Sequence, residues 1–199
     1  MKNNYQKAHF LLSAADIVQL PPDQGIEIAF VGRSNAGKSS VLNRVTQNKG
    51  LARVSKTPGR TQLVNVFTLD DDRRLIDLPG YGYAKVPLAA KLKWQRTVDS
   101  YICERESLKG LILIMDCRHP LRELDVQLLS FCHQRGLPVH ILLNKIDKIS
   151  KSAAAATLRR VKEAVGASGQ PLTLQLFSAL NNMGIKELYA LLDQWYGYA

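Results

Sequence analysis

Residues 32–39 read Gly-Arg-Ser-Asn-Ala-Gly-Lys-Ser, which matches the G-x-x-x-x-G-K-S/T pattern of a phosphate-binding loop. Its glycines let backbone N–H groups approach phosphate oxygens, and the following helix directs its positive end at them. Lys38 has the charge and length to reach the outer phosphates, and the Ser39 hydroxyl can ligate Mg²⁺. The loop predicts a nucleoside triphosphate site without choosing between ATP and GTP.

A second candidate site follows a short apolar run, where Asp77-Leu78-Pro79-Gly80 reads as a strand end and a turn. A carboxylate at position 77 can hold Mg²⁺, directly or through water, and the Gly80 N–H can contact a γ-phosphate. The alternative is a plain Asp-Pro-Gly turn. Downstream of a phosphate loop, the nucleotide interpretation is favoured.

Between these two motifs lies a polar segment, residues 56–61, punctuated by Gly and Pro. We expect a loop there that orders around Mg²⁺ and the γ-phosphate and relaxes after hydrolysis. Thr61 is the predicted additional metal ligand, with Thr57 as the alternative. Gly59 and Arg60 are expected to contact the nucleotide beside it.

Residues 144–147 read Asn-Lys-Ile-Asp directly after an apolar run. The Asp147 carboxylate can accept hydrogen bonds from guanine N1–H and the exocyclic amine, a donor pair that adenine lacks. Asn144 can tie the base to the phosphate loop, and the stem of Lys145 can cover the base face. Phe177-Ser178-Ala179 follows the last expected strand, where backbone N–H groups could reach the guanine carbonyl. The ligand is therefore expected to be GTP or GDP.

Two residues bear on the rate of hydrolysis. Tyr81 follows Gly80, where many GTPases have a Gln that orients water, so we expect slow intrinsic hydrolysis. A structural role for Tyr81 and Tyr83 in their loop is favoured over a catalytic one. Asn35 either coordinates a monovalent cation such as K⁺ beside the phosphates or stabilises the loop backbone, and both alternatives stay open.

These motifs need a scaffold in which strands end at one edge and helices begin there. Short apolar runs alternate with helical periodicity, which predicts a three-layer α/β domain with a mostly parallel sheet and one antiparallel edge strand. Strands are expected at 27–31, 64–69, 73–78, 111–115, 139–143 and 172–177, and helices at 38–47, 88–102, 124–133, 152–165 and 185–195, with Ser152 capping the fourth helix. Residues 1–22 read as an N-terminal arm that packs on the domain formed by residues 23–199.

Composition and charge restrict the kinds of partner and cellular compartment to be expected. The 199 residues carry a net charge of +10, and residues 28–69 contain seven Lys or Arg and no acid. A basic surface attracts polyanions, so RNA is a candidate partner; the alternative is a solvated face together with contacts to the nucleotide phosphates. The three cysteines are single and scattered, which is typical of reduced thiols in the cytoplasm. No apolar run is long enough for a membrane span.

Together, residues 32–40, 57–62, 77–84, 115–120 and 144–147 resemble the EngB (YihA/YsxC) family, within the TrmE–Era–EngA–EngB–septin group of bacterial GTPases. The resemblance covers nearly the whole chain. It implies a Ras-like P-loop domain, Mg²⁺-dependent GTP binding, association with the precursor of the large ribosomal subunit, through rRNA and ribosomal proteins, and a role in cell division through ribosome supply. We expect a monomer that contacts no DNA and no membrane.

The resemblance assigns a role to each motif position. Phosphate contacts are expected from Gly32, Arg33, Ser34, Asn35, Ala36, Gly37, Lys38, Ser39 and Ser40, with Gly59, Arg60, Thr61, Asp77, Leu78, Pro79 and Gly80 on the γ-phosphate side. Base contacts are expected from Asn144, Lys145, Ile146, Asp147, Phe177, Ser178 and Ala179. Metal ligands would be Ser39, Thr61 and Asp77, and catalysis would rest on Lys38, Thr61 and Asn35.

Two other functions remain as alternatives. One is a nucleotide-dependent binding module for a tRNA-modifying or division protein, in which hydrolysis is incidental. The other is an ATP-using P-loop enzyme, which Asn144 and Asp147 disfavour.

Overall fold

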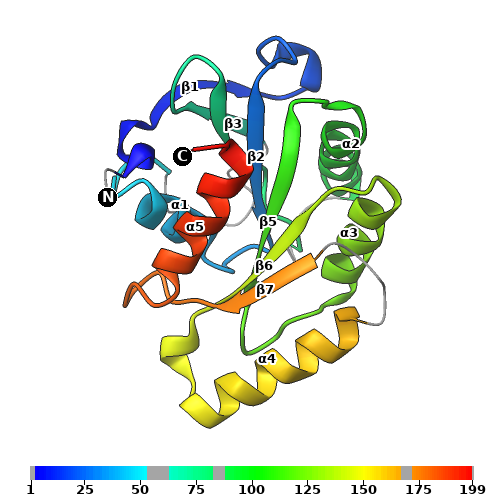
Figure 1. Ribbon diagram of the computed structural model, residues 1–199. Coiled ribbons are helices and arrows are strands. Elements are labelled where there is room, and N and C mark those ends of the chain that lie inside the picture. The colour runs from blue at the N-terminus through cyan, green and yellow to red at the C-terminus, as the bar shows by residue number, and fades with distance from the viewer. Residues whose placement is uncertain (1–2, 53–62, 83–87, 167–171, 199) are drawn as a thin grey trace.

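The computed structural model describes residues 3–52, 63–82, 88–166 and 172–198. A seven-stranded sheet in the order β1-β3-β4-β2-β5-β6-β7 forms its centre (Figure 1). The strands are β1 (His9–Ala14), β2 (Ile26–Gly32), β3 (Val64–Thr68), β4 (Arg73–Asp77), β5 (Leu108–Asp116), β6 (Val139–Asn144) and β7 (Leu172–Leu176). The pairs β2–β4, β2–β5, β5–β6 and β6–β7 are parallel.

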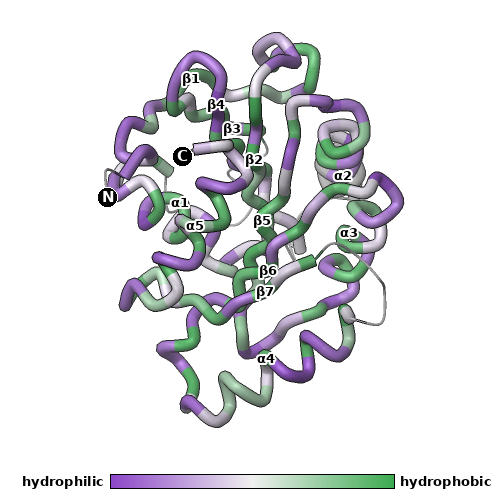
Figure 2. The backbone as a smooth tube through the Cα atoms, viewed as in Figure 1, coloured by the Kyte–Doolittle hydropathy of each residue, from purple (hydrophilic) through white to green (hydrophobic). Residues whose placement is uncertain are grey.

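Five α-helices cover the two faces of this sheet. Helices α1 (Lys38–Val45) and α5 (Ile185–Tyr196) pack on one face, and α2 (Leu88–Glu104), α3 (Glu123–Gln134) and α4 (Lys151–Gly166) pack on the other. Short 3₁₀ turns, η1 (Asn4–Lys7), η2 (Ile17–Gln19) and η3 (Ile146–Lys148), complete the elements. Figure 2 shows apolar segments concentrated along the central strands, as expected for parallel strands buried on both faces. The predicted three-layer α/β fold is confirmed.

The antiparallel part of the sheet differs in detail from the sequence expectation. Strand β3 runs antiparallel to β4, and β1, which the sequence analysis did not predict, pairs antiparallel with β3 on its outer side. The arm therefore contributes the edge strand. Its exposed residues His9, Phe10 and Leu11 show no alternation of apolar and polar types, so periodicity could not identify it.

The start of α4 is a correction. Ser152 was expected to cap this helix, but it lies inside the first turn. The cap is Ser150, whose hydroxyl accepts a hydrogen bond from the Ala153 N–H at 3.2 Å. Both serines have the chemistry of a cap, and sequence alone does not fix which of them leaves the helical conformation.

The register of the sheet brings the polar residues at the strand ends to one edge. Asp77 ends β4 opposite Phe30 of β2, and Asp116 ends β5 opposite Asn144 of β6. Because parallel strands present their carboxyl ends at the same edge, the loops that follow β2, β4, β5 and β6 meet there. Within the described residues, no helix is long and apolar enough to cross a membrane.

Candidate functional site

The phosphate loop connects the end of β2 to the start of α1. A side chain on Gly32 would place its Cβ 2.4 Å from the Ile114 carbonyl oxygen of β5, so only glycine fits at the strand end. Gly37 adopts φ +100°, and a Cβ there would lie 2.4 Å from Asn144 Nδ2. No side chain among the described residues caps α1 at Gly37, which leaves the first-turn N–H groups available to an anion.

Lys38 opens α1 and forms an ion pair with Asp77, the last residue of β4. Asp77 is buried, and its second carboxylate oxygen accepts a hydrogen bond from Asn65 Nδ2 at 3.2 Å. The structure thus brings the predicted phosphate lysine and the predicted metal carboxylate into direct contact. Ser39 follows Lys38 in the first turn of α1, so its hydroxyl belongs to the same edge.

The segment after Asp77 is tied to the phosphate loop by backbone hydrogen bonds. The Ser34 N–H donates to the Tyr81 carbonyl at 2.7 Å, and the Tyr81 N–H donates to the Gly32 carbonyl at 3.3 Å. Leu78 is buried, and its N–H donates to the Phe30 carbonyl at 3.0 Å. The two sequence motifs are therefore one continuous backbone structure.

The Tyr81 side chain points away from this backbone contact and into the core. Its hydroxyl donates to Asp125 Oδ1 of α3, and only 2% of Tyr81 is exposed. Burial and the Asp125 carboxylate raise the pKa of Tyr81 well above its usual value. A buried, hydrogen-bonded phenol does not orient water, so the geometry supports the structural role.

Asn144, at the end of β6, joins the phosphate loop to the base loop. Its Nδ2 donates to the Ala36 carbonyl at 2.9 Å, and its Oδ1 accepts from the Ala179 N–H at 3.3 Å. The Phe177 N–H donates to the Leu143 carbonyl at 2.9 Å, which extends the β6–β7 pairing up to the base loop. These contacts place residues 177–179 directly beside the Asn-Lys-Ile-Asp motif.

Asp147 is positioned by two neighbours. Its carboxylate accepts a hydrogen bond from Ser178 Oγ at 2.7 Å and pairs with Lys148 Nζ at 3.3 Å. The Ser178 hydrogen bond lowers the pKa of Asp147, and Lys148 lowers it further. Burial acts in the opposite direction but is the smaller effect beside the Ser178 hydrogen bond. The carboxylate is therefore ionised at neutral pH and offers only acceptors, as guanine recognition requires.

Asp116 is a site residue to which the sequence analysis assigned no role. It ends β5, and its Oδ2 lies 3.0 Å from Lys145 Nζ, which also donates to the Asn35 carbonyl. Arg118 forms a two-point contact with the same carboxylate, at 2.9 and 2.7 Å. Burial alone would raise the pKa of Asp116, but these cations hold it well below its usual range. The sequence feature that could have identified Asp116 as a site residue is its position directly after the apolar run of β5.

Arg44 was also missed as a site residue. It lies in the last turn of α1, and its Nε donates to the Ala179 carbonyl at 2.9 Å. The helix that begins at the phosphate loop therefore also anchors the base loop. The two residues are 135 positions apart in the chain, and no sequence pattern predicts their contact.

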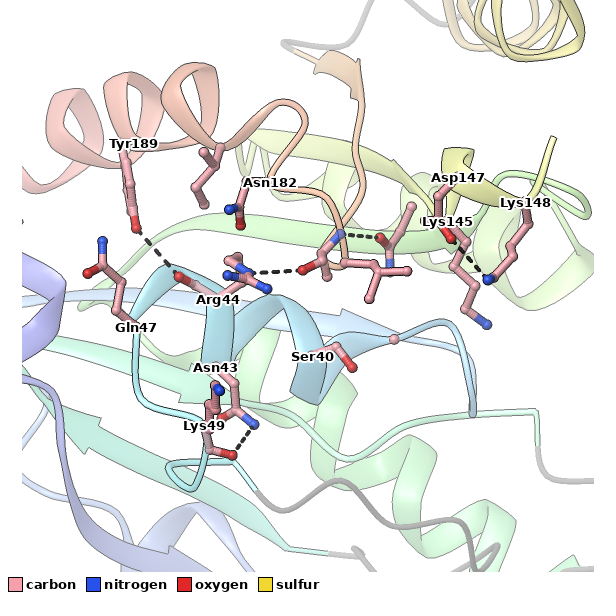
Figure 3. Close-up of a pocket in the computed structure, with 15 residues that line it drawn as sticks. Ser40, Asn43, Arg44, Gln47, Lys49, Lys145, Asp147, Lys148, Asn182 and Tyr189 are labelled. Atoms are coloured by element: carbon pink, nitrogen blue, oxygen red, sulfur yellow. Dashed lines mark hydrogen bonds and ion pairs between the residues drawn. The ribbon is translucent and has the colours of Figure 1, made fainter. Parts of the chain in front are cut away.

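A cleft of about 820 Å³ lies between α1, the loop after β6 and the start of α5, beside the Lys38–Asp77 pair (Figure 3). Its lining includes Gly37, Ser40, Arg44, Asn144, Lys145 and Asp147, but not Lys38 or Asp77. Asp147, Lys145 and Lys148 lie at one end of the view, and Arg44, Asn182 and Tyr189 line the other. The cleft is large enough for a nucleotide, since small-ligand pockets are typically ~300–1,000 Å³.

Several predicted site residues lie outside the described residues. These are Gly59, Arg60, Thr61, the alternative Thr57, and Tyr83. Of the basic residues between positions 28 and 69, Arg53, Lys56 and Arg60 also lie outside. Among the others, Lys38 and Arg44 are engaged within the site, and Lys49 is exposed at its border.

Comparison with known proteins agrees with this geometry. Residues 27–145 match the model of a family described as 50S ribosome-binding GTPase. A "Probable GTP-binding protein EngB" from Coxiella burnetii is 56% identical over 192 residues, covering 96% of this chain and 94% of its own. A protein of the same name from Pseudoalteromonas atlantica is 56% identical over 197 residues, covering 99% and 96%.

Solved structures resemble the fold. A crystal structure of a probable GTP-binding protein EngB has a TM-score of 0.69 at 20% identity, covering 87% of this chain and all of that one. Era from Aquifex aeolicus bound to GDP·AlF₄⁻ has a TM-score of 0.68 at 21% identity, covering 86% and 57%. The site and the fold together define a GTPase of the P-loop class. The full-length relatives identify its branch: the chain belongs to the EngB family of GTP-binding proteins.

Proposed function

We propose that this GTPase is a Mg²⁺-dependent switch with slow intrinsic hydrolysis that assists assembly of the large ribosomal subunit and, through ribosome supply, supports normal cell division. The single observation that carries the ribosomal part is the match of residues 27–145 to the 50S ribosome-binding GTPases. The nucleotide part rests on the pairing of Lys38 with Asp77 beside the phosphate loop and on Asn144 and Asp147, which line the cleft.

The donor set fits Mg²⁺. Ser39 and Asp77 supply a hydroxyl and a carboxylate, which are the hard oxygen ligands that this ion prefers, and Thr61 is the proposed third ligand. When bound, the ion neutralises charge on the β- and γ-phosphates. Lys38 pairs with Asp77 in this structure, so we expect its ammonium to exchange the carboxylate for phosphate oxygens when GTP binds.

Slow hydrolysis follows from the position after Gly80, where the Tyr81 hydroxyl is engaged by Asp125. Asn35 adopts φ +63°, a left-handed conformation that asparagine tolerates well, which supports its loop-stabilising role. A K⁺-coordinating role for Asn35 is a separate proposal. Equal turnover in K⁺ and Na⁺ at matched ionic strength would refute it.

The proposed partner is the precursor of the large subunit, in the cytoplasm, contacted by a monomer through its rRNA and ribosomal proteins. Among the structural neighbours, Era has been solved in complex with MgGDPNP and nucleotides 1506–1542 of 16S ribosomal RNA, which illustrates RNA engagement by a protein with this GTPase fold. The net charge of +10 favours such a polyanionic partner.

Co-sedimentation with large ribosomal subunits tests the proposal. We expect binding with a non-hydrolysable GTP analogue and much weaker binding with GDP. The Asp147→Asn variant is the control, because it should bind subunits with a xanthosine triphosphate analogue and not with the GTP analogue. Absent binding, or binding that ignores the nucleotide, would overturn the ribosomal switch and favour another partner.

A further inference from the structure

The exposed positive charge of the described chain gathers around α4 rather than along residues 28–69. Residues 148–166 contain five basic side chains and one acidic one, and all six residues are exposed. They are Lys148, Lys151, Arg159, Arg160, Lys162 and Glu163. Lys148 pairs with Asp147 of the base motif, whereas the other four cations form no ion pair with any described residue.

Other helices do not share this imbalance. Helix α5 carries one basic and two acidic residues, α3 carries two acids and no Lys or Arg, and α2 carries three basic and two acidic residues. The two cations of α1 are both engaged, Lys38 by Asp77 and Arg44 by the Ala179 carbonyl. The charge on α4 is therefore a local feature of one helix and not a uniform property of a basic protein.

Helical geometry sorts these cations into a stripe. Ala154 and Val161 are buried against the sheet. Lys151, Arg159 and Lys162 fall within about 80° of one another on the helix, beside that buried line, and extend over about 16 Å. Ala155 lies within the same stripe and is exposed, so its short side chain leaves room between the cations. Figure 1 shows α4 at the margin of the molecule, with one side away from the sheet.

We propose that this α4 stripe, Lys151, Arg159 and Lys162 flanking Ala155, is a docking surface for the phosphate backbone of RNA. The inference rests on the proposed ribosomal function and names where that function makes contact. Unpaired cations at the ends of flexible stems suit phosphates, and each contact releases condensed counterions, which makes binding strong at low salt. The position of α4 also links the stripe to the nucleotide site, because the helix begins four residues after Asp147 of the guanine motif.

The test compares two triple variants with equal loss of charge. K151Q/R159Q/K162Q removes the stripe. K7Q/K109Q/K186Q removes three exposed lysines from η1, β5 and α5 and serves as the control. Each protein is loaded with a non-hydrolysable GTP analogue and titrated against large ribosomal subunits and against protein-free RNA extracted from them, over a series of salt concentrations. Fluorescent GTP binding and thermal unfolding verify that both variants are folded.

We expect the stripe variant to lose about 10-fold or more in affinity for both probes, and the magnitude of the slope of log K against log salt to fall by about 2–3, as three lost phosphate contacts imply. The control should stay within about threefold of the unmodified protein. Equal losses in the two variants would overturn the stripe while leaving the ribosomal function intact. Loss on subunits with unchanged binding to free RNA would assign the stripe to a ribosomal protein instead. If the unmodified protein binds neither probe, both the stripe and the proposed function fall.

Discussion

Asp147 is held in place before any base arrives. The Ser178 hydroxyl and the Lys148 ammonium contact its carboxylate, and the Ser178 hydrogen bond and Lys148 lower its pKa. A preformed, ionised acceptor costs little to organise when guanine binds. The same arrangement makes the residue sensitive to a change from carboxylate to amide.

Asp147→Asn should weaken GTP affinity by about 100-fold, since two charge-assisted hydrogen bonds contribute about 3 kcal/mol. Affinity for xanthosine triphosphate should rise, because the amide can donate to the extra carbonyl of xanthine. Equilibrium titration with fluorescent analogues measures both. The control is Asp72→Asn, at an exposed carboxylate outside the cleft. Retained GTP affinity would refute the guanine assignment.

Tyr81 provides a second test at the residue scale. Tyr81→Phe removes the hydroxyl that donates to buried Asp125 and leaves a carboxylate oxygen short of a partner, so we expect a loss of about 1–3 kcal/mol in the free energy of unfolding. The hydroxyl lies in the core, so its removal should alter the barrier to GTP hydrolysis by less than about 1 kcal/mol, which would correspond to about fivefold in rate. We therefore expect single-turnover hydrolysis to change by less than about threefold.

Tyr198→Phe is the matched control, since it removes a hydroxyl that donates to the partly exposed Asp70 at 3.2 Å. We expect a stability loss of at most about 0.5 kcal/mol there. A large fall in hydrolysis by Tyr81→Phe at unchanged stability would show that the phenol acts in catalysis after all.

At the scale of elements, the β6–β7 pair contains a buried histidine. His140 Nδ1 lies 2.7 Å from Thr173 Oγ1, and its Nε2 lies 3.0 Å from Gln175 Oε1. Burial lowers the pKa of His140 to about 4, against the opposing effect of Gln175. The neutral ring therefore stabilises the fold above the unfolded pKa of 6.5, and this stability is lost progressively as pH falls from 6.5 toward the folded value of about 4.

The free energy of unfolding should accordingly fall by about 2 kcal/mol through this group between about pH 7.5 and pH 5. His140→Gln keeps a neutral polar side chain and cannot take up that proton. Urea unfolding at the two pH values should therefore show a drop that is smaller by about 2 kcal/mol in the variant than in the unmodified protein. An equal drop in both proteins would mean that His140 is not the group responsible.

The elements also show how far sequence reasoning reaches. The strands and helices around the phosphate loop and the guanine motif were predictable because apolar runs, periodicity and motif residues coincide there. Strand β1 was not, because its pairing with β3, whose partner residues lie 50 to 59 positions away, fixes its conformation. The contacts Arg44–Ala179 and Asp116–Lys145 could not be predicted for the same reason, because they depend on how distant segments pack. In the sequence, Arg44 and Asp116 look like ordinary surface charges.

At the scale of the whole molecule, the two ends of the described chain meet on the face of the sheet covered by α1 and α5 (Figure 1). Tyr5 of η1 is 1% exposed, stacks on Tyr189 with ring centroids 5.5 Å apart, and also contacts Tyr196 and Tyr198. Its hydroxyl donates to Asp193 at 2.6 Å. Residues near the N-terminus thus complete the packing of the last helix.

A chain of contacts connects this cluster to α1. Asn3 Nδ2 donates to the Tyr189 hydroxyl at 2.9 Å, and that hydroxyl donates to the Val45 carbonyl at 3.0 Å, at the end of the helix whose first residue is Lys38. The nucleotide end of α1 is held separately, by the buried Val41 and Leu42 and by the sheet edge. Tyr189 of the cluster lines the cleft only at the end away from Lys145 and Asp147. We therefore expect the cluster to affect global stability much more than nucleotide affinity.

Tyr5→Ala should lower the free energy of unfolding by about 3–5 kcal/mol, as deletion of a buried aromatic ring does. Tyr5→Phe keeps the ring, loses only the hydrogen bond to Asp193, and should cost about 1 kcal/mol. Because ligand binding adds RT ln(1 + [L]/Kd), saturating GTP should raise the stability of the unmodified protein and of both variants by the same increment if their Kd values agree. Chemical unfolding with and without GTP measures all of these quantities. A smaller GTP increment in Tyr5→Ala would show that the cluster affects nucleotide binding, through α1 or through Tyr189, which lines the cleft. Similar losses in the two variants would mean that the stacked ring contributes little to the fold.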